Sequence, residues 1–151
     1  MPEPVSGWEG VSNVTREGEY TFAGQPTEAA IERFAAEGGS MVIDLRAHQG
    51  KDVPPFDERA KVEAAGMKYV HIPMSAATFS GADVERFAGA VEESDGPVLI
   101  HCGTSNRVGG MWAAYLARKR GVPVDRAIAA GKSAGMRSDD VEQAARRVMG
   151  G

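Results

Sequence analysis

The sequence is poor in several residue types and patterns, and each shortage excludes a class of protein. It has 151 residues but one cysteine, Cys102, so no disulfide can form within the chain. No apolar run approaches the roughly 20 residues that a membrane-spanning helix requires. The three histidines are widely separated, so no metal site is expected. The first residues lack a basic segment followed by an apolar run, which argues against a signal peptide.

Basic residues are also not in excess. The formal net charge is −4, so the overall charge favours neither nucleic acid nor an anionic membrane as a partner. We therefore expect a cytoplasmic protein without a cofactor. A lone cysteine next to a histidine, in a reduced compartment, indicates a reactive thiol rather than a structural crosslink.

The composition is that of an ordinary globular protein. Hydrophobic residues make up 42% and charged residues 25% of the chain, and its length suits one domain with one core. Residues 1–19 are mostly polar and are expected to form an N-terminal arm with little regular structure. Residues 20–151 are expected to form the single domain.

Predicted strands alternate with predicted helices along that domain. The strands are expected at 20–23, 41–46, 68–74 and 97–100, and helices are expected after Thr27, at 56–65, after Ser80, from Arg107 to about 120, from Pro123 and at about 138–149. This order predicts an α/β domain of three layers, with a mostly parallel central sheet flanked by helices. In such folds ligands bind at the carboxyl ends of the strands. Polar residues follow three of these ends: Asp44 with Arg46, then His71, then His101 with Cys102.

The stretch from Pro97 to Val108 carries the strongest chemical signal. A short buried strand ends at His101 and Cys102, a small polar turn follows, and Arg107 opens an amphipathic helix. Cysteine is nucleophilic as its thiolate, and a helix N-terminus and a nearby guanidinium both favour an anion. Arginine can bind two oxygens of that anion at once. We therefore predict Cys102 as nucleophile, with Arg107 and a turn that holds an oxyanion. The turn residues are Gly103, Thr104, Ser105 and Asn106.

We make more specific predictions for individual residues of this stretch and its neighbours. Gly103 allows close backbone approach, and Asn106 is the residue expected to take left-handed backbone angles. Asp44 either braces the loop by accepting backbone N–H bonds or is simply solvated at its strand end. Arg46 either adds positive potential to the site or forms a surface ion pair.

The pattern His101-Cys102-x-x-x-x-Arg107 after a buried strand resembles the cysteine-dependent phosphatases of the tyrosine and dual-specificity type. The chain resembles more closely a bacterial phosphatase-like family that occurs as the companion domain of beta-lactamase-hydrolase-like proteins. The resemblance covers roughly residues 20–136. The supporting segments, in order, are Gly24-Gln25-Pro26, 42–46, 65–73, and 96–102 continued by 107–112.

The resemblance implies a tyrosine-phosphatase-like fold and hydrolysis of phosphomonoesters, either phosphorylated proteins or small molecules. In that family the Cys102 thiolate would attack phosphorus while Arg107 and the loop amides hold the phosphoryl oxygens. His101 would orient the loop by hydrogen bonding. An aspartate on another loop would protonate the leaving group, and water would then release phosphate.

Two features keep other functions open. Four residues separate Cys102 from Arg107, where ordinary tyrosine-type phosphatases have five, and this spacing is also typical of rhodanese-like sulfurtransferases. The segment 74–79 has no carboxylate where the family's acid is expected, which leaves a non-catalytic phosphate-binding module as a third possibility. Substitutes for the acid are His48, Asp52 and Asp57, in the 47–57 loop.

Overall fold

A computed structural model describes residues 1–150 of the chain. Its centre is one six-stranded sheet with the strand order β1-β2-β3-β6-β4-β5. Neighbouring strands are parallel from β3 through β6 and β4 to β5, whereas β1, β2 and β3 pair antiparallel. The predicted α/β fold with a mostly parallel sheet is thus confirmed. The strands are β1 (Glu3–Pro4), β2 (Thr15–Glu17), β3 (Tyr20–Ala23), β4 (Met41–Asp44), β5 (Lys68–His71) and β6 (Val98–His101).

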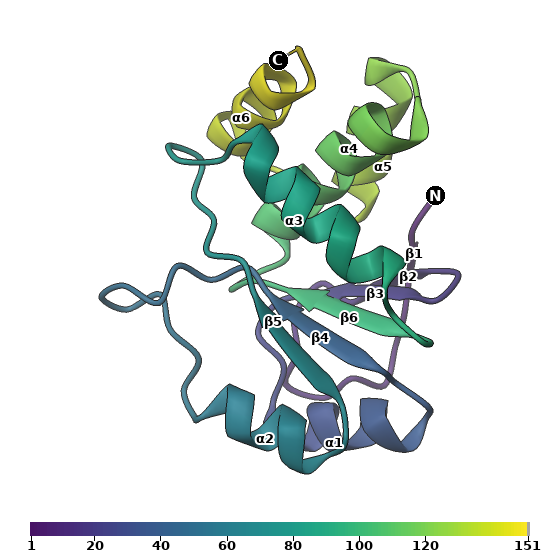
Figure 1. Ribbon diagram of the computed structural model, residues 1–151, viewed down its shortest axis with the longest axis vertical. Coiled ribbons are helices and arrows are strands. Elements are labelled where there is room, and N and C mark those ends of the chain that lie inside the picture. The colour runs from purple at the N-terminus through teal and green to yellow at the C-terminus, as the bar shows by residue number, and fades with distance from the viewer. Residues whose placement is uncertain (151) are drawn as a thin grey trace.

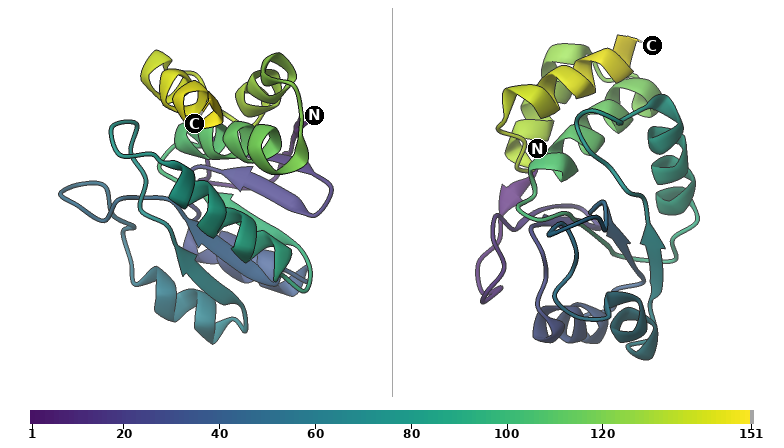
Figure 2. Two further views of the ribbon diagram at one scale, coloured as in Figure 1. Left: turned by 45° about the horizontal axis from the view of Figure 1, so that its top comes forward. Right: turned by 90° about the vertical axis from the view of Figure 1, so that its left-hand side faces the viewer.

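Helices cover both faces of the sheet (Figure 1). One face carries α1 and α2, and the other carries α3, α4, α5 and α6, a layering that is also visible from the side in Figure 2. The helices are α1 (Glu28–Ala36), α2 (Glu58–Ala64), α3 (Gly81–Glu92), α4 (Asn106–Arg120), α5 (Val124–Ser133) and α6 (Asp139–Gly150). No helix among residues 1–150 has an apolar span long enough to cross a membrane.

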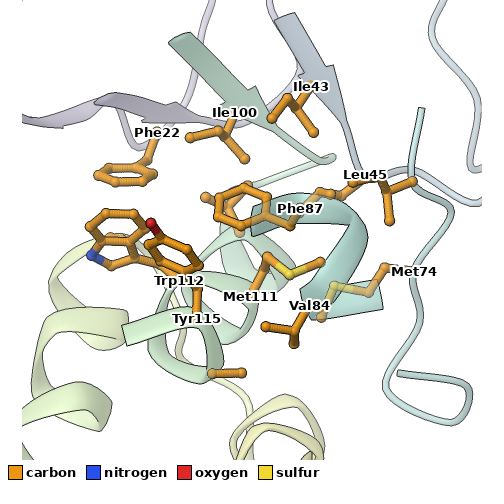
Figure 3. Packing of buried hydrophobic residues seen from close by; sticks show 14 of the residues in the cluster. Phe22, Ile43, Leu45, Met74, Val84, Phe87, Ile100, Met111, Trp112 and Tyr115 are labelled. Atoms are coloured by element: carbon orange, nitrogen blue, oxygen red, sulfur yellow. The ribbon is translucent and has the colours of Figure 1, made fainter. Parts of the chain in front are cut away.

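The central strands are buried on both faces, which explains their unbroken apolar runs. In β6, Ile100 faces α3 and α4 while Leu99 faces the α1 and α2 layer. Figure 3 shows Phe22, Ile43 and Ile100 from the sheet against Phe87, Met111 and Trp112. Trp112 packs on Phe22 with ring centroids 4.9 Å apart, so α4 is fixed on β3, the neighbour of the strand β6 that leads to the cysteine loop.

The first residues are more ordered than we expected. Residues 3–4 and 15–17 form β1 and β2, and the side chains of Trp8 and Val14 are buried. Trp8 lies against Phe34 of α1, with ring centroids 6.2 Å apart. Regular structure is thus limited to two short strands, as expected, and the additional order comes from scattered apolar residues that cover α1 and the edge of β3.

Candidate active site

The cysteine loop leaves the sheet at the carboxyl end of β6. Cys102 is buried, with 1% of its surface exposed, and its N–H donates to the Ala23 carbonyl at 3.3 Å. The Gln25 N–H donates to the Gly103 carbonyl at 3.0 Å, so the loop is held against the end of β3. A side chain at Gly24 would stand 2.3 Å from Ser12 Oγ and 2.7 Å from the Gly103 carbonyl oxygen. Glycine is required at position 24 for this close approach.

Ser105, and not Asn106, is the residue with left-handed backbone angles. Its φ is +70°, and its hydroxyl donates to the Ala134 carbonyl at 2.7 Å inside the protein. This buried hydrogen bond stabilises a conformation that a non-glycine residue seldom adopts. The expectation for Asn106 was wrong because Asn106 is already the first residue of α4.

The outer side of the loop is bound to the segment between α5 and α6 and to Asn13. Asn106 Oδ1 accepts hydrogen bonds from the backbone N–H groups of Arg137 at 2.8 Å and Ser138 at 3.2 Å. The Thr104 carbonyl accepts from Asn13 at 2.9 Å and from the Arg137 guanidinium at 3.2 Å. These contacts fix the outside of the loop.

The backbone N–H groups of Gly103 and Thr104 find no acceptor among residues 1–150. They precede the N-terminus of α4, whose first turn contains no acidic residue. Unpaired amides and the positive end of the helix dipole together favour an anion at this point.

Arg107 is the charged group of the loop, and it is bound by a carboxylate. Its two terminal nitrogens donate to Asp52 at 2.7 and 2.9 Å, and one of them also donates to the Met74 carbonyl at 3.0 Å. The hydrogen bond to Asp52 raises the pKa of Arg107, and the interaction with Cys102 close by raises it further. The guanidinium therefore lies beside both the thiol and the segment between β4 and α2.

Asp52 connects the two arginines of the site. Besides Arg107, its carboxylate accepts from Arg46 Nε at 3.0 Å and from the Ala47 N–H at 2.8 Å. The hydrogen bonds from Arg107, the strongest influence, and those from Ala47 and Arg46 hold the pKa of Asp52 far below its usual range. Arg46, which we had expected either in the site or in a surface ion pair, thus forms an ion pair with Asp52 close to Arg107.

Beneath the loop lies a fully buried charged cluster. His101 Nε2 is 2.5 Å from a Glu58 carboxylate oxygen and 3.8 Å from Asp44, and His101 Nδ1 is 3.1 Å from the Cys102 carbonyl oxygen. Burial alone would lower the pKa of His101, but the hydrogen bond and charge of Glu58 outweigh burial and raise it. Both ring nitrogens of His101 therefore face acceptor oxygens, an arrangement that favours the protonated imidazole next to the cysteine.

Asp44 belongs to this cluster rather than to the loop. Its carboxylate accepts hydrogen bonds from the Arg46 N–H at 2.8 Å and the Tyr69 hydroxyl at 2.6 Å, and it contacts His48 Nε2 at 2.7 Å. Burial alone would raise the pKa of Asp44, but the charge of His101 and the Tyr69 hydroxyl hold it below its usual value. Within residues 1–150 it accepts no hydrogen bond from the cysteine loop, and its complete burial rules out the solvated alternative.

Asp44, His48 and His71 are also close enough to be considered as metal ligands, with ligand atoms within 4.8 Å of one another. The two imidazole rings, however, are stacked, with centroids 3.8 Å apart and an angle of 24° between their planes. His71 Nε2 already lies 2.6 Å from the Arg46 carbonyl oxygen, and His48 Nε2 lies 2.7 Å from Asp44. The arrangement is therefore a poor metal site.

Glu58 is the residue of the site that sequence analysis missed. It lies four residues before Val62 on α2, and both side chains are buried. This spacing places Glu58 on the inner face of a helix, and a carboxylate there requires a buried partner. The signal was present, but it did not identify His101 as that partner.

Comparisons with known proteins agree with this geometry. The family described as "DSP-PTPase phosphatase fused to NAD+ Kinase" matches residues 4–148. A beta-lactamase hydrolase-like protein of Agrobacterium fabrum is 36% identical over 84 residues, which are 54% of this chain and 20% of that protein. The chain therefore covers only a small part of the length of this curated relative.

Solved structures show the same fold. A candidate phosphatase from Neisseria meningitidis has a TM-score of 0.72 at 26% identity and covers 88% of this chain and 94% of its own. A cysteine-to-serine variant of TpbA from P. aeruginosa, solved in complex with phosphotyrosine, has a TM-score of 0.72 at 20% identity and covers 99% and 88%.

Proposed function

This chain belongs to the family of DSP-PTPase phosphatases fused to NAD+ kinase, and we propose that it hydrolyses phosphomonoesters with Cys102 as the nucleophile. The observation that carries the proposal is the cysteine loop itself. Two backbone N–H groups without acceptors and the Arg107 guanidinium surround the end of the strand that bears the thiol. This is the set of donors that three equatorial phosphoryl oxygens require.

The reaction has two steps. The Cys102 thiolate attacks phosphorus, the S–P bond forms, and the P–O bond to the leaving group breaks. Water then attacks phosphorus, the S–P bond breaks, and inorganic phosphate leaves with the thiolate restored. Arg107 close to Cys102, and the protonated form of His101 that Glu58 favours, stabilise the thiolate in both steps.

The proposed substrate is a phosphorylated protein or small molecule. The variant of TpbA that binds phosphotyrosine has this fold, which supports an aryl phosphate as the first substrate to test. Arg46, with its side chain 14% exposed and close to Arg107, adds positive charge on the approach to the loop.

The test is the hydrolysis of p-nitrophenyl phosphate between pH 5 and 8 by the wild type and by Cys102→Ser, with urea unfolding to show that both are folded. We expect turnover that vanadate inhibits and that the variant lacks. Absence of turnover by folded wild-type protein would refute the proposal.

If the folded wild type shows no turnover, two further measurements distinguish the alternative functions. Thiocyanate formation from thiosulfate and cyanide, dependent on Cys102, would indicate a sulfurtransferase. A rise in melting temperature with phosphate that Arg107→Ala abolishes would indicate a binding module.

A further inference from the structure

The proposed reaction needs a general acid, and none lies at the expected place. The leaving oxygen needs a proton, yet residues 74–79, which follow β5, contain no carboxylate. Three other carboxylates near this end of the sheet already have roles. Asp44 and Glu58 are buried in the cluster beneath the loop, and Asp57 caps α2 by accepting the Ala60 N–H at 3.2 Å.

Asp52 is the carboxylate that reaches the cysteine loop. It binds both terminal nitrogens of Arg107, and its side chain is 29% exposed, so solvent and substrate can reach it. One terminal nitrogen of Arg107 lies 3.7 Å from the position that a Cβ would take on Gly103. The Asp52 carboxylate thus binds the guanidinium that a phosphoryl group would bind, next to the loop amides.

We propose, building on the proposed function, that Asp52 is the general acid and base of this site and that it exchanges with the substrate phosphoryl group on Arg107. When phosphoryl oxygens take hydrogen bonds from Arg107, Asp52 loses them and comes to lie beside an anion. Both changes raise its affinity for a proton. Arg46 and Arg107 are the charged side chains that contact Asp52, and they keep it ionised until that moment.

The protons balance over the two steps. The substrate enters as the monoanion, and its proton passes to Asp52. As Cys102 forms the S–P bond, the P–O bond breaks and Asp52 gives the proton to the leaving oxygen, which departs as the alcohol or phenol. In the second step Asp52 takes a proton from the attacking water while the P–S bond breaks and Cys102 leaves as thiolate. Asp52 then gives this proton to the departing phosphate, which leaves as the monoanion, and the carboxylate is ionised again.

The test compares Asp52→Asn with wild type on substituted phenyl phosphates. p-Nitrophenolate leaves without a proton, whereas unsubstituted phenolate needs one. We expect Asp52→Asn to lower kcat/KM by about 10²–10⁴-fold for phenyl phosphate, and by about tenfold or less for p-nitrophenyl phosphate. The matched control is Asp57→Asn, which removes the same charge nearby while asparagine keeps the helix cap; its activity should equal that of the wild type on both substrates.

An equal loss on both substrates would overturn the inference, because it would mean that Asp52 only positions Arg107. The wild type provides a second measurement that does not depend on the folding of a variant. Its kcat/KM for phenyl phosphate should fall about tenfold per pH unit above the second phosphate pKa of about 6, because the monoanion carries the proton. A rate that instead increases with the dianion would also overturn the inference. Failure of the wild type to hydrolyse either ester would refute the proposed function itself.

Discussion

The buried ion pair between Glu58 and His101 supports a quantitative prediction about stability. The Glu58 residue is 3% exposed and His101 is not exposed at all, and the two side chains approach to 2.5 Å. Gln25 donates a second hydrogen bond to the other Glu58 oxygen at 2.8 Å. Substitution Glu58→Gln keeps the shape and one acceptor oxygen but removes the charge that His101 faces.

Breaking a buried pair by removing one partner costs about 3–5 kcal/mol. Because glutamine retains an acceptor for one of its two neighbours, we expect the lower end, about 3 kcal/mol of unfolding free energy. For a domain of this size that loss lowers the melting temperature by about 6–12 °C. Urea unfolding at pH 6 measures the free energy directly.

The pH dependence has a definite sign. Since the pKa of His101 is raised in the folded protein, its contribution is fully present below its unfolded value of about 6.5 and is lost as pH rises through the folded value. The difference between wild type and Glu58→Gln should therefore shrink from pH 6 to pH 9.

The matched control is Glu63→Gln on the same helix. Glu63 is 58% exposed and 3.8 Å from Arg59, so its loss should change stability by no more than about 0.5 kcal/mol. A Glu58→Gln loss below about 1 kcal/mol, or one that does not vary with pH, would contradict a charged buried pair.

Two further predictions concern the frame of the site. In Gly109→Ala the new Cβ would lie 2.3 Å from the Gly131 carbonyl oxygen and 2.4 Å from the Met136 nitrogen, so α4 and α5 must separate. We expect the free energy of unfolding in urea to fall by about 1–3 kcal/mol. An unchanged midpoint would contradict this close packing. Tyr69→Phe removes a hydroxyl that donates to buried Asp44, and we expect a loss of about 1–3 kcal/mol at pH 7. Because the pKa of Asp44 is lowered in the folded state, its contribution is present above the unfolded value and is lost as pH falls, so acid unfolding of this variant should begin at higher pH than in the wild type; an unshifted acid transition would contradict the role of Tyr69.

Much of the fold was predictable because its signals are local. The strand at 20–23 has the predicted bounds, Thr27 caps α1 through its side chain, and Ser80 and Asp83 form the predicted capping box. Gly121 ends α4 with a positive φ of 67°. Such signals depend on residues a few positions apart, so the sequence contains all of the partners.

Local signals of this kind could not identify the partners of the residues that surround the cysteine. Arg107 and Asp52 are 55 positions apart in the sequence, and His101 and Glu58 are 43 positions apart. Both pairs form because β4 lies directly beside β6 in the sheet, although β5 lies between them in sequence. The segment that follows β4 therefore stands beside the segment that follows β6.

The sequence by itself thus determined a thiol at the end of a buried strand, a tight turn, and an arginine in the first turn of a helix. It did so because strand, turn and helix are consecutive in the chain. Only the tertiary structure decided which carboxylate binds that arginine and which one charges the buried histidine. The physical reason is that strand order, set by packing of the whole sheet, chooses which distant loops become neighbours.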